Sequence, residues 1–244
     1  MQSTSLDDQL QPQKIIITGA SSGIGFEAAI ELCTKGHQVI AIARSKEKLQ
    51  NLRKICLDLN PEAVILPVVF DILNDEETAL ANFVQQHWTK FDVLINNAGT
   101  LINKTFDELT EFDMAEMFQS NVLSHFRIIK TLKPLLHPSS HIVNIGSMGG
   151  FQGSSKFPGL VAYSASKAAL HNLTECLAQE FLADKISVNC LALGSAQTEM
   201  LEKAFPGYQS PVMAFEMGKY IADFALTGHR LFNGKILPVA VTTP

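Results

Sequence analysis

The stretch that decides the fold is Thr18-Gly19-Ala20-Ser21-Ser22-Gly23-Ile24-Gly25. It joins an Ile-rich apolar run at 14–18 to an amphipathic segment at 26–35, which predicts a strand followed by a helix. In such a turn Gly19 permits the bend, Gly23 lets the backbone approach a phosphate, and Gly25 lets the helix pack closely. A glycine-rich turn alone is weak evidence, but a flanking strand and helix favour a dinucleotide site whose pyrophosphate binds the helix N-terminus.

Outside this turn, short apolar runs alternate with longer amphipathic segments. Seven runs are predicted as strands, at 14–18, 38–43, 64–70, 93–96, 141–145, 187–192 and 235–241. Six helices are predicted between them, at 26–35, 46–59, 75–88, 113–132, 163–183 and 213–226. Strands that are apolar on both faces and alternate with helices indicate a parallel sheet covered on both sides. We therefore expect one α/β doubly wound domain over 1–244, with a polar N-terminal tail at 1–13.

Composition excludes several classes of partner. The 244 residues carry a formal net charge of -5 and no run of Lys and Arg, so neither nucleic acid nor an anionic membrane is expected as a partner. The four cysteines (Cys33, Cys56, Cys176 and Cys190) lack the spacing of a metal site, and no metal is expected. The polar, acidic N-terminus does not resemble a signal peptide, and no apolar stretch approaches membrane-spanning length. A cytoplasmic protein with reduced thiols is the expectation.

The end of the second predicted strand bears on the choice of cofactor. An acidic residue there accepts a hydrogen bond from a ribose 2′-hydroxyl and indicates NAD. This chain has Ala43 followed by Arg44. A guanidinium can hold a 2′-phosphate by two parallel hydrogen bonds, with Ser21, Ser22 and Lys46 available to assist. The sequence therefore favours NADP(H), although a solvated Arg44 at a helix start is the alternative.

Four further motifs follow predicted strands or lie on predicted helices. Asn96-Asn97-Ala98-Gly99 follows the fourth strand, and Ser147 follows the fifth. Tyr163-Ser164-Ala165-Ser166-Lys167 opens a long helix, and Asn121 lies within the helix at 113–132. With the glycine turn, these motifs resemble the short-chain dehydrogenase/reductase family in their T-G-x-x-x-G-x-G, N-N-A-G and Y-x-x-x-K elements. The resemblance runs from about Lys14 to Val241 and implies a Rossmann-type fold.

The resemblance also implies which residues bind the dinucleotide. The cofactor-binding positions carried over are Gly19, Ser21, Ser22, Gly23, Ile24, Gly25, Arg44, Asp71, Ile72, Asn97, Ala98, Gly99, Tyr163, Lys167, Gly194, Ala196 and Thr198. Within this set Asp71 matches the family's adenine-binding position, and Thr198 matches the threonine that meets the nicotinamide carboxamide. One departure is Leu193-Gly194, where the family usually has Pro-Gly, so the path of this loop is less certain.

The same resemblance implies a catalytic set of Asn121, Ser147, Tyr163 and Lys167. A hydride moving between nicotinamide and a carbonyl carbon leaves the oxygen in need of a proton. Lys167 lies one helical turn from Tyr163, and its charge is expected to stabilise the phenolate and lower the pKa of Tyr163. Reaching a pKa near 7 requires a shift of about 3 units, or roughly 4 kcal/mol, more than one lysine supplies. In the reduction direction Tyr163 starts protonated and acts as the general acid.

Ser147 is expected to hydrogen-bond the carbonyl oxygen, and Lys167 to hold the ribose hydroxyls. By resemblance, Asn121 holds a water that connects Lys167 to solvent. The expected function is a ketone or aldehyde reductase or alcohol dehydrogenase. A catalytically silent dinucleotide sensor is the alternative, and an intact proton relay argues against it. Enoyl reduction is disfavoured by the three-residue spacing between Tyr163 and Lys167.

The substrate is not readable from the sequence, although two segments are expected to line its pocket. The loop at 195–211 offers Met200, Leu201, Phe205 and Tyr208, and the segment after Ser147 offers Phe151, Phe157 and Leu160. An apolar lining suits a small carbonyl or alcohol substrate with hydrophobic substituents, but ordinary loop packing explains these residues equally well. A homodimer or homotetramer is expected by resemblance, through the helix that carries Tyr163.

Overall fold

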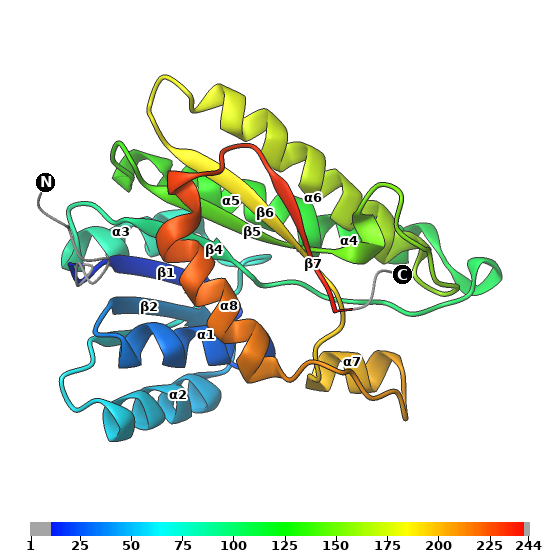
Figure 1. The fold of residues 1–244 in the computed structure, drawn as a ribbon, viewed down its shortest axis with the longest axis horizontal. Helices are drawn as coiled ribbons and strands as arrows, with labels where there is room; N and C mark the ends of the chain where they lie inside the picture. Colours follow the sequence, from blue (N-terminus) through cyan, green and yellow to red (C-terminus); the bar gives the residue numbers. More distant parts are fainter. Residues whose placement is uncertain (1–10, 242–244) are drawn as a thin grey trace, which may run out of the picture.

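The computed structural model describes residues 11–241, which are built around one seven-stranded sheet (Figure 1). The strands lie in the order β3-β2-β1-β4-β5-β6-β7, and every neighbouring pair is parallel. Their bounds are β1 Lys14–Thr18, β2 Gln38–Ala43, β3 Ile65–Val69, β4 Val93–Asn96, β5 His141–Ser147, β6 Ser187–Leu193 and β7 Ile236–Val239. The predicted doubly wound sheet with about seven parallel strands is confirmed.

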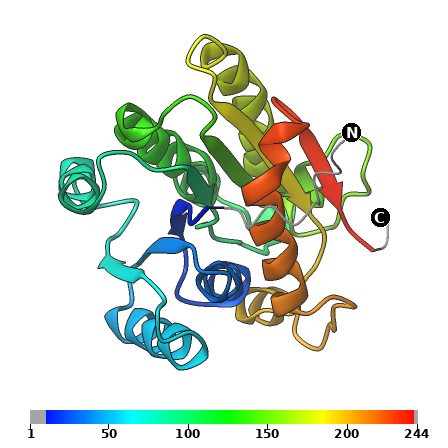
Figure 2. The ribbon, with the colours of Figure 1, turned by 60° about the vertical axis from the view of Figure 1, so that its left-hand side comes forward.

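Helices cover both faces of this sheet (Figure 2). Their bounds are α1 Gly23–Thr34, α2 Lys46–Leu59, α3 Glu77–His87, α4 Glu111–Phe118, α5 Ser124–Leu132, α6 Val161–Glu180, α7 Glu199–Ala204 and α8 Ala214–Thr227. Short 3-10 turns lie at Phe106–Glu108, Lys133–Leu135, Met148–Gly150 and Gly228–Arg230. Helices α1, α2 and α8 pack on one face, and α3, α5 and α6 pack on the other.

The three consecutive isoleucines of β1 show how the sequence builds both layers. Side chains alternate across a strand, so Ile15 and Ile17 enter the core beneath α1 and α8, whereas Ile16 enters the core beneath α3 and α5. All three are fully buried. A strand without a polar face is stable only where both faces are covered, in agreement with the position of β1 inside the sheet, between β2 and β4.

Two elements differ from the sequence-based expectation. The predicted helix at 113–132 begins at Glu111 and is interrupted by a π-helical turn at Gln119–Leu123. The predicted loop at 195–211 contains α7, whose first turn is capped where Thr198 Oγ1 accepts from the Leu201 N–H at 3.2 Å. Helix α7 has only six residues, too few for a periodic apolar pattern to reveal it.

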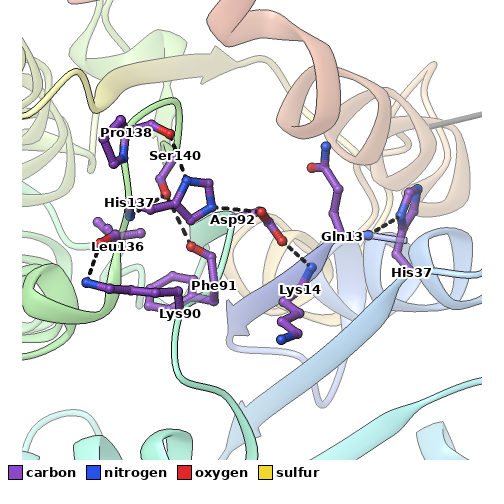
Figure 3. A network of polar contacts seen from close by, with 10 residues as sticks. All are labelled: Gln13, Lys14, His37, Lys90, Phe91, Asp92, Leu136, His137, Pro138 and Ser140. Atoms are coloured by element: carbon purple, nitrogen blue, oxygen red, sulfur yellow. Dashed lines mark hydrogen bonds and ion pairs between the residues drawn. The ribbon is translucent and has the colours of Figure 1, made fainter. Parts of the chain in front are cut away.

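A polar network ties together the strand starts at the N-terminal edge of the sheet (Figure 3). The Asp92 carboxylate accepts from the Lys14 N–H at 2.7 Å and contacts His137 Nε2 at 2.8 Å. Nearby, the Gln13 N–H donates to His37 Nδ1 at 3.1 Å. Of the predicted polar tail at 1–13, residues 1–10 lie outside the described residues. The network holds the starts of the strands together. Ligands in open parallel sheets bind at the opposite edge, beyond the carboxyl ends of the strands.

Within residues 11–241, no helix combines the length and apolar character needed to cross a membrane. Nor do the described His, Cys, Asp and Glu side chains gather into a group that could hold a metal ion.

Candidate active site

A cavity of about 860 Å³ lies at the carboxyl ends of the strands. Segments that follow β1 through β6 all contribute to its wall. Nearly all of the predicted site residues line it, namely Gly19, Ser21, Ser22, Gly23, Ile24, Arg44, Asp71, Ile72, Asn97, Ala98, Gly99, Ser147, Tyr163, Lys167, Gly194, Ala196 and Thr198. Gly25 and Asn121 do not line it. The fold thus brings together residues that are spread over most of the chain.

The glycine turn adopts a conformation that side-chain-bearing residues rarely accept. Gly19 and Gly23 have φ values of +70° and +58°, in the left-handed region. A Cβ on Gly19 would lie 2.8 Å from the Ala98 Cα, so a side chain there would also collide with the loop after β4. Asn97 braces this turn because its Nδ2 donates to the Thr18 carbonyl at 3.1 Å and to the Gly19 carbonyl at 3.2 Å. The result is an open strip of backbone that fits a pyrophosphate.

The ends of β2 and β3 also border the cavity. Ala43 is buried at the end of β2, and Arg44 after it is exposed at the cavity wall. After β3, Asp71 Oδ1 accepts from the Leu73 N–H at 2.9 Å, and its Oδ2 accepts from Asn74 Nδ2 at 3.0 Å. Asp71 therefore shapes its own turn beside the cavity. A guanidinium next to a small uncharged residue is an arrangement that can accept a phosphate.

The cavity wall also contains the three side chains of the predicted catalytic group that line it, Ser147, Tyr163 and Lys167. Tyr163 and Lys167 lie one turn apart on α6, and Lys167 Nζ is 5.9 Å from the centre of the Tyr163 ring. Lys167 Nζ donates to the Ile145 carbonyl at 2.8 Å, which fixes the buried ammonium behind the phenol. Ser147 ends β5 and lies close enough to Tyr163 to lower its pKa, and Ser147 Oγ accepts from the Gly149 N–H at 3.1 Å.

Burial controls the protonation of this cluster. Burial raises the pKa of Tyr163, and Ser147 offsets this only in part. Burial also lowers the pKa of Lys167 to about 8. The family resemblance implies that Lys167 lowers the pKa of Tyr163, whereas in this structure the largest influence on that pKa is burial, which raises it. Tyr163 therefore holds its proton at neutral pH, as a general acid must.

Asn121 lies in the π-helical turn and is completely buried. Its Nδ2 donates to the Thr100 carbonyl at 3.0 Å and to Ser166 Oγ at 3.0 Å, and its Oδ1 accepts from the Thr100 N–H at 3.0 Å. The side chain thus fixes the loop after β4 to α6 instead of reaching into the cavity. π-Helical turns are rare and occur often at functional sites.

The comparisons with known proteins agree with this geometry. The family model described as short chain dehydrogenase matches residues 13–209. The chain belongs to this family. An uncharacterized oxidoreductase of Staphylococcus saprophyticus is 31% identical over 195 residues, covering 79% of this chain and 82% of that protein. A 3β-hydroxysteroid dehydrogenase of Mediterraneibacter gnavus is 31% identical over 193 residues, covering 78% and 68%.

A solved structure extends the likeness to nearly the whole chain. A short chain dehydrogenase from Burkholderia cenocepacia, crystallised in complex with NADP, superposes with a TM-score of 0.81 at 25% identity. The match covers 96% of this chain and 98% of that one. This short-chain dehydrogenase therefore shares its fold with a protein that binds the dinucleotide.

Part of the cavity wall is formed by apolar side chains. The predicted wall residues Met200, Leu201, Phe205, Tyr208, Phe157 and Leu160 all line it. Phe151 does not line it, because its ring packs edge-on against His171 with centroids 6.5 Å apart. Sequence reasoning missed Leu101 and Met148, which also line the cavity. The available signal was their position, since each closely follows a motif at the end of a strand.

The loop after β6 keeps its place in this short-chain dehydrogenase despite Leu193. The Gly194 N–H donates to the Val239 carbonyl at 2.8 Å and continues the pairing of β6 with β7. Thr198 then stands opposite the glycine turn, where a Cβ on Gly23 would lie 3.3 Å from its Cγ2. Gly23 and Thr198 therefore lie against each other at the cavity wall, and a side chain at position 23 would press on Thr198.

Proposed function

We propose that this protein is an NADP(H)-dependent oxidoreductase that interconverts a carbonyl compound and its alcohol, with Tyr163 as the general acid and base. The observation that carries the proposal is the meeting of Tyr163, Ser147 and Lys167 in one cavity with an open glycine turn. We further propose that residues 1–244 form one catalytic domain, and that the protein assembles as a homodimer or homotetramer, as is common in its family.

The glycine turn and the loop after β6 would hold the dinucleotide between them. Gly23 and Thr198 both line the cavity that would hold it, and Lys167 would hold the ribose hydroxyls of its nicotinamide half. When bound, the reduced dinucleotide supplies a hydride to the carbonyl carbon. Thr198 Oγ1 already accepts from the Leu201 N–H, and its own hydroxyl hydrogen is available to an amide oxygen.

The proton comes from Tyr163. A free tyrosine has a pKa of about 10 and burial raises that of Tyr163 further, so its phenol is protonated at neutral pH and can donate to the carbonyl oxygen as negative charge develops there. Ser147 Oγ would donate a second hydrogen bond to the same oxygen and stabilise that charge. Lys167 behind the phenol stabilises the resulting phenolate until it is reprotonated. In the oxidation direction the phenolate takes the alcohol proton instead.

Two observations support NADP(H) over NAD(H). Arg44 stands at the cavity wall directly after β2, where an acidic residue would favour the 2′-hydroxyl of NAD. The Burkholderia cenocepacia relative binds NADP.

The apolar wall formed by Phe157, Leu160 and Met200 supports a substrate with hydrophobic substituents next to its carbonyl.

The test is consumption of NADPH, with NADH in parallel, against a panel of aldehydes, ketones, quinones and keto-esters. We expect turnover with NADPH that Tyr163→Phe abolishes, because this variant keeps the ring and loses the acidic proton. Arg44→Gln is expected to raise the KM for NADPH about tenfold and to change that for NADH little, as for loss of a charge-assisted hydrogen-bond pair. NADPH binding without turnover of any substrate contradicts the proposal and favours a dinucleotide sensor.

A further inference from the structure

An ion pair lies at the edge of the cavity, which Glu199 lines. Lys48 Nζ lies 3.2 Å from Glu199 Oε2 and 3.5 Å from Glu199 Oε1. Lys48 belongs to the first turns of α2, which follows β2, and Glu199 is the first residue of α7, which follows β6. The pair therefore joins the start of α2 to the start of α7.

Both partners stand close to residues that the proposed function assigns to the dinucleotide. Glu199 and Arg44 line the same cavity, and Glu199 directly follows Thr198. Lys48 lies in the first turn of α2, and its N–H donates to the N-cap Ser45 Oγ, next to Arg44, at 3.3 Å. The cations Arg44 and Lys48 thus both follow β2 within five residues, and Lys48 is the one that holds the Glu199 carboxylate.

The pair is weak enough to be exchanged. The Lys48 and Glu199 side chains are 48% and 63% exposed, and ion pairs at such exposure contribute little to stability. A phosphate carries close to two negative charges at neutral pH and three acceptor oxygens, so it is a stronger partner for an ammonium than a carboxylate.

We propose that Lys48 binds the 2′-phosphate of the dinucleotide together with Arg44, and that Glu199 competes with this phosphate for Lys48. The inference rests on the proposed NADP(H) function and names the residues that set its selectivity. Glu199 reduces the affinity for NADPH, because the phosphate must displace a carboxylate. Glu199 affects the affinity for NADH far less, because the ribose 2′-hydroxyl of NADH does not compete for Lys48.

Binding of NADPH also changes what holds α7. With Glu199 displaced, α7 stays attached through Asn103 Nδ2, which donates to the Ala204 carbonyl at 2.7 Å. Met200 and Leu201, next to Glu199, line the apolar part of the cavity. The 2′-phosphate and the substrate wall are therefore connected through one short helix.

The test is a fluorescence titration of the full chain with NADPH and with NADH. It compares the wild type with Glu199→Gln, Lys48→Gln and the double variant. Glu202→Gln and Lys54→Gln are matched controls, because they remove like charges from exposed positions on the same two helices. Circular dichroism confirms that each variant folds.

We expect Glu199→Gln to tighten NADPH binding by about two- to fivefold, the range of an exposed charge pair, and to leave NADH binding within twofold. Lys48→Gln should weaken NADPH binding by about three- to tenfold, as for loss of one phosphate contact. In the Lys48→Gln background, Glu199→Gln should no longer change the ratio of the two affinities. The two controls should leave this ratio unchanged.

Three results would overturn the inference, and they are distinguishable. If NADPH binds and turns over but Glu199→Gln changes the affinity ratio no more than Glu202→Gln, the competition is wrong while the proposed function stands. If Glu199→Gln has the same effect with and without Lys48, the carboxylate acts on the cofactor without Lys48. If neither dinucleotide binds the wild type, the proposed function fails together with the inference.

Discussion

The side chain of Asn121 and the backbone of Thr100 form a closed ring of two hydrogen bonds, both at 3.0 Å. The asparagine amide satisfies the N–H and the carbonyl of one residue in the loop directly after Asn97-Ala98-Gly99. A Cβ on Gly99 would lie 2.7 Å from Asn121 Oδ1, so the amide also packs directly against this loop. The ring therefore positions the backbone that borders the cavity beside Lys167.

Replacing Asn121 by Ala should damage the site more than the fold. Thr100 loses both of its partners, at a cost of about 1–3 kcal/mol, and the loop after β4 loses its fixed position. We expect kcat/KM to fall by about 10- to 100-fold, with a smaller relative change in NADPH affinity. Steady-state kinetics and titration measure the two effects. Ser166→Ala is the matched control: it removes the third bond of Asn121 and a bond to the Tyr163 carbonyl, leaves both bonds to Thr100 in place, and should retain most activity.

The pH dependence of NADPH turnover should report Lys167. Its pKa is lowered to about 8 by burial, so the ammonium is present below this pH and lost above it. The pKa of Tyr163 is raised, so the phenol does not titrate in the same range. We expect kcat/KM for NADPH to be level near pH 6–7 and to fall above about pH 8. A profile that stays level to about pH 9.5, or one unchanged in Lys167→Met, would contradict this assignment.

His141 should make the protein less stable in mild acid. Asn189 Nδ2 lies 3.0 Å from His141 Nε2 and donates to it, because the same amide also donates to the Phe232 carbonyl and its Oδ1 accepts from the Lys235 N–H. His141 Nδ1 contacts the Ala225 carbonyl at 2.9 Å. No acceptor remains for a second imidazole proton. Burial, the largest cause, and the nearby His229 lower the pKa of His141 to about 4, although the bond to Ala225 acts in the opposite direction.

The direction of this change in stability with pH follows from proton linkage. A histidine with a lowered pKa binds more protons when unfolded, so its stabilisation is complete above about pH 6.5 and is lost as the pH falls towards 4. His141→Asn keeps an amide donor for Ala225 and has no proton to gain. Between pH 7.5 and 5.5 this variant should lose about 1 kcal/mol less stability than the wild type. Urea unfolding at both pH values measures the difference, and equal losses in both proteins would refute the prediction.

Gly146, directly before Ser147, is expected to tolerate no side chain. A Cβ there would overlap His171 Nε2 and would lie 2.6 Å from Cys190 Sγ. His171 and Cys190 are both buried, so neither can move into solvent. We expect Gly146→Ala to destabilise the protein by about 1–3 kcal/mol and to misplace Ser147, reducing activity.

A second substitution separates this overlap from a general loss of strand stability. Adding His171→Ala removes the closest obstacle, so the double variant should recover part of the activity lost in Gly146→Ala. A double-mutant cycle on thermal unfolding should show coupling between the two positions, because they are in contact. Additive effects would mean that the overlap with His171 is not the cause.

Much of the fold is encoded locally, and the sequence predicted it for that reason. The apolar runs that became β1 and β2 have the predicted bounds, because residues buried on both faces leave no polar alternation. The glycine turn was recognisable because its backbone conformation excludes other residues. The three-residue spacing of Tyr163 and Lys167 placed both on one face of a helix, since i and i+4 positions are neighbours there.

What the sequence could not predict depends on contacts between distant segments. The π-helical turn around Asn121 accompanies hydrogen bonds to Thr100 and Ser166, which lie on other elements. Helix α7 is too short to have a periodic signature, and Phe151 and Phe157 are indistinguishable by sequence although only Phe157 lines the cavity.

The sequence by itself determined the strand, glycine turn and helix at 14–34 and the spacing of Tyr163 and Lys167, because both are properties of neighbouring residues. The tertiary structure alone decided that burial raises the pKa of Tyr163 and lowers that of Lys167, and that Glu199 meets Lys48 across 151 residues of chain. The physical reason is that desolvation and charge pairing depend on which side chains the crossovers of the sheet bring together, and a linear pattern does not contain those distances.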